Sequence, residues 1–289
     1  MEKTFIEQVR RFNRAVTVRT GALYDSYLGR GRPLGQARLL FEVGAEGSDI
    51  ASLRERLGLD SGYASRLLKA LEADGLVALE ADDGDRRRRL VTLTDRGTVE
   101  RAAYDSLSDG LAHALLDALG PSQRERLVRA MADVESLLKA ASITIAAEPA
   151  DSPDATRCVA AYYGELAARF EGGFDPGSGG YAGKATQAGG AFLVARLEGN
   201  AIGCGSLKAL DASTGEIKRM WVAPDARGLG LARRLLETLE QEARQLGLTR
   251  IVLDTNRSLV EAQSLYRKAG YRETAPYNDN SYADFWFEK

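Results

Sequence analysis

Apolar residues recur every three or four positions through most of the first 140 residues, which is the spacing of one helix face. In the first such stretch, residues 4–28, the apolar positions include Phe5, Val9, Phe12 and Val16. Glycines, prolines and capping residues divide the rest of the pattern into further helices. We expect these over residues 34–43, from a cap at Ser48 or Asp49 to residue 57, and over 61–73, 94–119 and 122–140.

Two short runs between these helices have the composition of β-strands instead. They lie at residues 76–79 and 89–93, and a polar stretch at 82–88 separates them. Strand-like runs joined by a polar turn predict a β-hairpin. Two helices joined by a short turn and followed by a hairpin form a winged helix-turn-helix, so the first half is expected to be mostly α with this fold.

The second half alternates strand and helix patterns, which predicts an α/β (α+β) domain with a mixed sheet. The boundary lies in residues 141–156, so the expected domains are 1–141 and 142–289. Residues 171–190 are glycine-rich and irregular. We expect strands at 143–147, 191–197, 202–210, 217–222, 251–255 and within 271–289, and helices at 156–170, 231–246 and 259–268.

Composition narrows the possible chemistry. The chain has 289 residues and a net charge of −2, so a nucleic-acid surface would have to be local. Two cysteines, Cys158 and Cys204, are too few for a disulfide scaffold, and a cytoplasmic location is expected. A single histidine, His113, excludes a Ser-His-Asp triad and a multi-histidine zinc site. We find neither a signal-peptide core nor a membrane-length apolar stretch.

The most specific pattern is Arg227-Gly-Leu-Gly-Leu-Ala232, between the strand ending at Val222 and the helix over 231–246. A strand that leads through a glycine-rich turn into a helix start can hold a phosphate. Glycines allow close approach of the backbone, and the free amides and dipole of the helix attract an anion.

This segment resembles the GNAT acetyltransferases, whose pyrophosphate signature is Arg/Gln-x-x-Gly-x-Gly/Ala, matched here by Arg227, Gly230 and Ala232. The resemblance covers residues 143–289 and implies acetyl-CoA as co-substrate and no metal. It implies pyrophosphate contacts from the loop and a 3′-phosphate contact from Arg233 or Arg234, unless these arginines are ordinary surface residues. The implied coenzyme-binding residues are Trp221, Val222, Arg227, Gly228, Leu229, Gly230, Leu231, Ala232, Arg233, Asn256, Ala262 and Tyr266.

The same resemblance implies two catalytic residues. Tyr266 matches the family's general acid, which protonates the departing thiolate, and Glu216 matches an acidic position that can deprotonate the acceptor ammonium. A packed helix tyrosine and a surface carboxylate are the alternatives. The acceptor is expected to be a small polar amine, or an amino-acid-like one if Arg219 binds a carboxylate rather than forming a surface ion pair. The implied substrate contacts are Arg219, Phe174, Tyr277 and Asn278.

The first half resembles the MarR family of DNA-binding regulators. The resemblance rests on residues 57–68 and 71–77, on Asp85 and Arg87 of the wing, and on Leu93-Thr94 with Gly97; a Gly84 stands where the family often has Arg. It implies a homodimer on near-palindromic double-stranded DNA. The apolar stripes of the outer helices are too broad for a small monomer to bury and predict a dimer seam including Leu107, Leu111 and Met131, unless these residues pack within the chain. The implied DNA contacts are Ser61, Tyr63, Ser65, Arg66 and Lys69 on one helix and Arg86 and Arg87 on the wing.

Three functions remain open on the sequence alone. The chain is a bifunctional regulator and N-acetyltransferase, a regulator whose second domain only senses acetyl-CoA or an amine, or an acetyltransferase that uses its helical half for dimerisation. Intact Tyr266 and Asn256 favour an active enzyme, while Gly84 and the neutral first half allow the third option. The acceptor, the operator sequence, the direction of regulation and any coupling between the halves are not specified.

Overall fold

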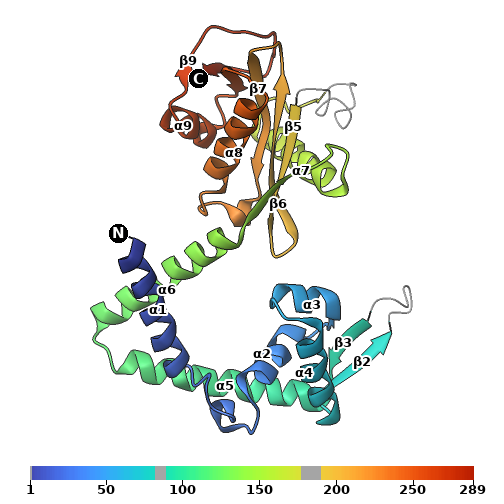
Figure 1. Ribbon diagram of the computed structural model, residues 1–289, viewed down its shortest axis with the longest axis vertical. Helices are drawn as coiled ribbons and strands as arrows, with labels where there is room; N and C mark the ends of the chain where they lie inside the picture. Colours follow the sequence, from blue (N-terminus) through green and yellow to red (C-terminus); the bar gives the residue numbers. More distant parts are fainter. Residues whose placement is uncertain (1, 82–88, 177–189) are drawn as a thin grey trace. The chain divides into compact units, whose positions relative to one another are not determined.

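The computed structural model describes residues 2–81, 89–176 and 190–289 (Figure 1). These residues form two compact units, Met1–Val128 and Arg129–Lys289. The two units divide within helix α6, and the boundary expected at 141/142 lies at the last residue of the same helix. Among the described residues, no helix is both long and apolar enough to cross a membrane.

The first unit is mostly helical and contains a three-stranded sheet in the order β1-β3-β2. This agrees with the winged helix-turn-helix expectation. Its elements are α1 (Glu2–Arg19), η1 (Tyr27–Gly29), α2 (Leu34–Val43), β1 (Ser48–Asp49), α3 (Ile50–Arg56), α4 (Ser61–Ala73), β2 (Val77–Ala81), β3 (Arg89–Leu93), α5 (Asp95–Asp117) and the start of α6 (Pro121–Ser142).

Polar caps begin the helices that carry the helix-turn-helix. The Asp49 carboxylate accepts from Ser52 N (2.9 Å), and Asp60 accepts from Tyr63 N (2.8 Å). Asp49 is therefore the cap of α3, while Ser48 pairs with Val91 in the sheet. Each cap satisfies a backbone amide that the helix itself leaves without a partner. The expected helix over 4–28 was too long: α1 ends at Arg19, before Gly21 takes a left-handed φ of 68°.

The outer helices leave much of their apolar surface uncovered within the single chain. Phe5, Val9 and Phe12 of α1 are exposed, and so are Leu107 and Leu111 of α5. No residue of α6 is buried. Apolar helix faces of this length are usually covered by a partner.

The second unit is built on a seven-stranded mixed sheet in the order β4-β5-β6-β7-β8-β10-β9. Its elements are β4 (Thr144–Ala147), α7 (Pro153–Arg169), β5 (Gly190–Leu197), β6 (Asn200–Ala209), β7 (Thr214–Val222), η3 (Pro224–Ala226), α8 (Leu231–Gln245), β8 (Arg250–Thr255), α9 (Val260–Lys268), β9 (Arg272–Glu273) and β10 (Phe285–Glu288). The α/β mixed-sheet prediction is thus confirmed.

Alternate residues of β5 pack against different helices, so both faces of the sheet are covered (Figure 1). Phe192 and Val194 belong to a cluster with Ala155 and Cys158 of α7. Leu193 and Ala195 belong to the larger core with residues of α8 and α9. Because successive strand side chains point to opposite faces, α7 lies on one face of the sheet and α8 and α9 on the other.

The sheet opens between β7 and β8, which are its one parallel pair among the described strands. Their register runs only from Thr214↔Arg250 to Glu216↔Val252. Beyond this point β7 carries a bulge opposite β6, between the Ser206↔Lys218 and Cys204↔Trp221 pairs. Arg219, inside the bulge, has a φ of 54°. The bulge bends β7, and the two strands separate toward their carboxyl ends.

Candidate active site and nucleic-acid surface

The predicted phosphate loop leads from β7 into α8. Gly228 and Gly230 have φ values of 83° and 73°, which a residue with a Cβ adopts at a cost. Gly230 is the N-cap of α8 without a side-chain hydrogen bond, and Arg234 N donates to its carbonyl (3.2 Å). The amides of Leu231, Ala232 and Arg233 therefore have no intrahelical acceptor and form an anion-binding helix start.

Arg227 lies beside this loop and is held by a carboxylate of α7. Its Nε donates to Val222 O (3.2 Å), and its terminal nitrogen pairs with Glu165 (2.6 Å). Glu165 also accepts from Trp221 Nε1 (3.0 Å) and pairs with Arg169 (3.2 Å). The role of Glu165 was not predicted from the sequence, because nothing in the helical pattern of α7 distinguishes it from a solvent-facing glutamate.

The two arginines after the loop have different environments. Arg233 is exposed and pairs with Glu237 (2.8 Å), so it is accessible to a phosphate. Arg234 instead donates to Ala140 O (2.6 Å) and Ile143 O (2.9 Å), at the end of α6. Arg234 thus binds backbone carbonyls, and Arg233 is the remaining candidate for the 3′-phosphate of the coenzyme.

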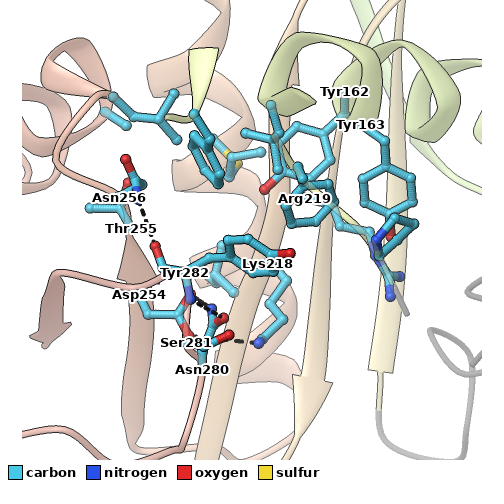
Figure 2. A pocket seen from close by; sticks show the side chains of 18 of the residues that line it. Tyr162, Tyr163, Lys218, Arg219, Asp254, Thr255, Asn256, Asn280, Ser281 and Tyr282 are labelled. Carbon is cyan, nitrogen blue, oxygen red and sulfur yellow. Dashed lines mark hydrogen bonds and ion pairs between the residues drawn. The ribbon is translucent and has the colours of Figure 1, made fainter. Parts of the chain in front are cut away.

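Two adjoining cavities lie in the opening between β7 and β8. The smaller, about 200 Å³, is lined by Trp221, Val222, Arg227 and Ala232 and by residues of α7 and α9. The larger, about 330 Å³, is lined by residues of α7, β7, β8 and the C-terminal tail (Figure 2). Their shared wall consists of Tyr162, Leu166, Met220, Leu259, Ala262 and Tyr266. The loop-side cavity therefore meets the second cavity at two tyrosines.

Tyr266, the predicted acid, is 5% exposed and lies next to the rings of Tyr271 and Phe287. Burial, with a smaller contribution from the Asp254 carboxylate, raises the pKa of Tyr266. Burial likewise raises the pKa of Tyr162, on α7. Both phenols remain protonated at neutral pH, as a proton donor must be.

Glu216, the predicted base, is 4% exposed and does not line either cavity. It accepts from Tyr277 Oη (3.1 Å) and Asn278 Nδ2 (3.2 Å) and pairs with Lys218 (3.1 Å). Tyr277 and Asn278, predicted to contact the acceptor, therefore hold Glu216 and are not among the residues that line the larger cavity.

Asp254 is the carboxylate of this cluster that lines the larger cavity. It accepts from Asn278 Nδ2 (2.7 Å). It also accepts from Asn280 Nδ2 (3.2 Å), and Lys218 Nζ lies 3.7 Å away (Figure 2). Asn278 and Lys218 thus connect Glu216 to Asp254. Asp254 was not predicted from the sequence, although a carboxylate directly after the apolar residues Ile251–Leu253 was a usable signal.

Four further predicted residues line the cavities. Asn256 donates to Tyr282 O (2.7 Å) and accepts from Ser258 N (2.9 Å), so its amide currently fixes the C-terminal tail. Phe174 and Arg219 both line the larger cavity, and Ala262 lies in the shared wall.

Among the described residues, no group of three or more His, Cys, Asp or Glu side chains is arranged to hold a metal ion.

In the first unit, α4 presents a polar face beside an apolar one. Leu67, Leu68 and Leu71 are buried, whereas the predicted DNA contacts Ser61, Tyr63, Ser65, Arg66 and Lys69 are exposed. The Arg66 guanidinium lies 5.7 Å from the centre of the Tyr63 ring. A cavity of about 410 Å³ beside α4 is also lined by Arg54 and Arg89. Arg86 and Arg87 lie outside the described residues.

Comparison with known proteins assigns a family to each half of the chain. The model of the MarR family matches residues 30–88, and that of the acetyltransferase (GNAT) family matches residues 147–271. The chain thus contains one region that matches the MarR family and one that matches the acetyltransferase (GNAT) family, as the two resemblances predicted. Acetyl-CoA is the acetyl donor of the GNAT family.

Individual relatives match only part of the chain. An IAA acetyltransferase of Azospirillum brasilense is 46% identical over 88 residues, which are 30% of this chain and 57% of that protein. An uncharacterised N-acetyltransferase of Schizosaccharomyces pombe is 39% identical over 93 residues, which are 32% of this chain and 57% of that protein. The chain thus spans little more than half of these relatives. A GNAT family acetyltransferase from Elizabethkingia anophelis, crystallised with acetyl-CoA, is 23% identical, with 51% of this chain and 97% of that chain covered and a TM-score of 0.39.

Proposed function

We propose that the chain is a bifunctional protein, a DNA-binding transcriptional regulator over residues 1–141 and an acetyl-CoA-dependent N-acetyltransferase over residues 142–289. The observation that carries the proposal is that a diphosphate-type loop opens into one cavity, which meets a second, charged cavity at Tyr266. A donor bound at the loop and an acceptor in the larger cavity would have their reacting atoms on either side of this wall.

The donor site follows from the loop and β7. Amides of residues 228–232 hold the diphosphate, Arg227 and Arg233 add positive charge, and Ala232 and Ala262 leave room for the coenzyme. The ladder between β7 and β8 ends at Glu216, so backbone groups of Trp221 and Val222 can pair with the amides of the pantetheine arm. Asn256 would have to exchange its bond to Tyr282 O for a pantetheine contact.

The chemistry needs a base on the acceptor side and an acid beside the sulfur. Asp254, at the cavity wall, takes the ammonium proton, and Glu216 supports it through Lys218 and Asn278. The amine nitrogen then bonds to the thioester carbonyl carbon, and the carbon–sulfur bond breaks. Tyr266 gives its proton to the thiolate, and the second proton that the nitrogen loses as it becomes an amide restores the phenol. Alignment of two bound partners supplies much of the rate.

The acceptor is a small primary amine. A cavity of about 330 Å³ is at the small end of the range for ligand sites, which begins near 300 Å³. Asp254 suits an ammonium group, while Arg219 suits a carboxylate, which would make the acceptor amino-acid-like.

The helical half is proposed to bind near-palindromic double-stranded DNA as a homodimer in the cytoplasm. The exposed polar face of α4 fits a major groove, with Arg66 as the base-reading candidate. The uncovered apolar faces of α1, α5 and α6 support dimerisation.

Three assays on the purified full chain test the proposal and separate the alternatives. Thiol release from acetyl-CoA over an amine panel should show turnover, a footprint on genomic fragments should be selective and salt-sensitive, and sedimentation should give a dimer. Tight acetyl-CoA binding without turnover on any amine would favour a sensor. Turnover without a selective footprint would favour an enzyme whose helical half serves dimerisation.

A further inference from the structure

Five aromatic side chains gather along the larger cavity. Phe174 packs on Tyr282 (ring centres 4.9 Å apart), Tyr163 (5.4 Å) and Phe170 (5.8 Å), and Tyr162 continues the row at 5.5 Å from Tyr163. They come from α7, from the residues after it and from the C-terminal tail, so the fold brings them together from distant parts of the sequence. All five line the cavity.

None of these five residues is among the buried ones, although the ring of each is in contact with another ring. Aromatic residues that only formed part of the hydrophobic core would be buried, as Phe192 and Phe287 are elsewhere in this unit. These partly exposed residues line a cavity of ligand size instead. Aromatic surface of this kind gains most free energy by covering another flat apolar group.

The charged residues of the cavity lie beside this aromatic wall. Figure 2 shows Tyr162, Tyr163 and Arg219 on one side and Asp254 and Asn256 on the other. Arg219 is 9% exposed and has a left-handed φ, a backbone conformation that persists only where the surroundings enforce it. The bulge therefore keeps a cation next to the rings, while a carboxylate lies across the cavity.

We propose that the acceptor is a primary amine that carries an aromatic ring, with the ring against Phe170, Phe174 and Tyr282 and the amine toward Asp254. The inference rests on the proposed acetyl transfer and narrows its substrate. The amine nitrogen bonds to the acetyl carbon, the coenzyme leaves as its thiol, and the ammonium proton goes to Asp254, so the products are an N-acetyl arylalkylamine and CoA. An α-carboxylate on the acceptor would pair with Arg219.

The test compares matched acceptors on the full chain: L-phenylalanine against L-alanine, and phenethylamine against ethylamine. We expect kcat/KM, by thiol release, to be about 10- to 100-fold higher for the aromatic member of each pair. Phe174→Ser should remove most of this preference, and Phe174→Leu, the apolar control, should retain part of it. Arg219→Gln should lower kcat/KM for phenylalanine but not for phenethylamine if the carboxylate is recognised.

Equal or higher kcat/KM for alanine and ethylamine, or a loss at Phe174→Ser that is the same for every acceptor, would overturn the aromatic assignment while leaving acetyl transfer in place. If no acceptor is turned over, calorimetry of the same four compounds in the presence of CoA reads the preference directly. Absence of acetyl-CoA binding would refute the proposed function itself, which is a separate outcome.

A second, independent observation concerns Arg234 and the end of α6. Its guanidinium donates to Ala140 O and Ile143 O, the carbonyls where α6 ends and β4 begins. The same residue belongs to the first turn of α8, where Arg234 N donates to Gly230 O. The last carbonyls of a helix need such donors, so one arginine joins the coenzyme loop to the helix that leads back into the first unit.

We infer that acetyl-CoA binding and the order of the α6 C-terminus are coupled through Arg234. A diphosphate on the amides of residues 230–232 fixes the first turn of α8 and, with it, the direction of the Arg234 side chain. The helix end that Arg234 caps is then held more firmly. The inference rests on the proposed acetyl-CoA site and adds a route by which its occupancy reaches the regulatory half.

Hydrogen exchange of the full chain with and without saturating acetyl-CoA tests the coupling. In the native protein we expect slower exchange in residues 227–235 and, by about threefold or more, in residues 138–144. Arg234→Gln should keep the first effect and lose the second. Arg244→Gln removes the same charge from the last turn of α8, which lines neither cavity, and should keep both effects. Protection of 138–144 that survives Arg234→Gln, or that is absent from the native protein, overturns the coupling; no protection at 227–235 refutes the acetyl-CoA site instead.

Discussion

Replacement of Gly230 by Ala should weaken acetyl-CoA binding without unfolding the chain. Gly230 has a φ of 73°, and a Cβ built there meets no atom within 4 Å. The substitution therefore costs backbone strain and causes no clash in the unliganded protein. A left-handed conformation costs an alanine about 1–2 kcal/mol. If the loop of the unliganded variant relaxes to avoid this strain, acetyl-CoA binding must restore the left-handed conformation of residue 230. The dissociation constant for acetyl-CoA then rises about 5- to 30-fold.

Gly247 offers a matched control, because its φ of 77° is almost the same and its Cβ would also meet no atom within 4 Å. It follows the other end of α8 and lines neither cavity. Gly247→Ala should lower the melting temperature by about 2–4 °C per kcal/mol of strain while leaving the dissociation constant unchanged. Titration calorimetry with acetyl-CoA measures the dissociation constant of both variants and so tests this difference. Equal affinities for the two variants would refute a role for the Gly230 backbone in binding.

Four further outcomes follow from the roles proposed for these residues. Tyr266→Phe should lower kcat by about 100-fold or more with the acetyl-CoA dissociation constant unchanged, and an unchanged kcat would remove Tyr266 from the mechanism. Because burial raises the pKa of Tyr266 above its ordinary value near 10, the phenol stays protonated as pH rises, and the pH–rate profile should show no loss from this group below about pH 10. Asp254→Asn should lower kcat/KM for the acceptor more than Glu216→Gln, since only Asp254 lines the cavity; the reverse order would make Glu216 the base. Arg66→Ala should abolish a selective DNA footprint, and a footprint that persists would place the base-reading residue elsewhere.

The sequence predicted the elements well because local chemistry determines them. Asp60 caps α4, and the apolar spacing from Ala64 to Leu71 sets its buried face. The glycines of residues 228–230 likewise mark the phosphate loop in any context. The helix over 4–28 was extended too far because its apolar pattern continues past Gly21, where the left-handed backbone ends the helix.

The arrangement of the site depended on register and long-range contacts, which local patterns do not contain. The sheet opens because of the bulge at Arg219 and the early end of the β7–β8 ladder. No residue pattern in the sequence predicted either feature. Glu216 and Asp254 are both strand carboxylates in the sequence. Only the fold shows that the C-terminal tail covers the first and leaves the second at the cavity.

The central claim is that the amides at the start of α8 bind the diphosphate of acetyl-CoA. Titration calorimetry of the full chain with acetyl-CoA and with S-acetylpantetheine, which has the same thioester arm but no diphosphate, tests it most directly. The account predicts one site per chain for acetyl-CoA, with S-acetylpantetheine bound at least about 100-fold more weakly. Equal affinities for the two compounds, or no binding of acetyl-CoA, would contradict it.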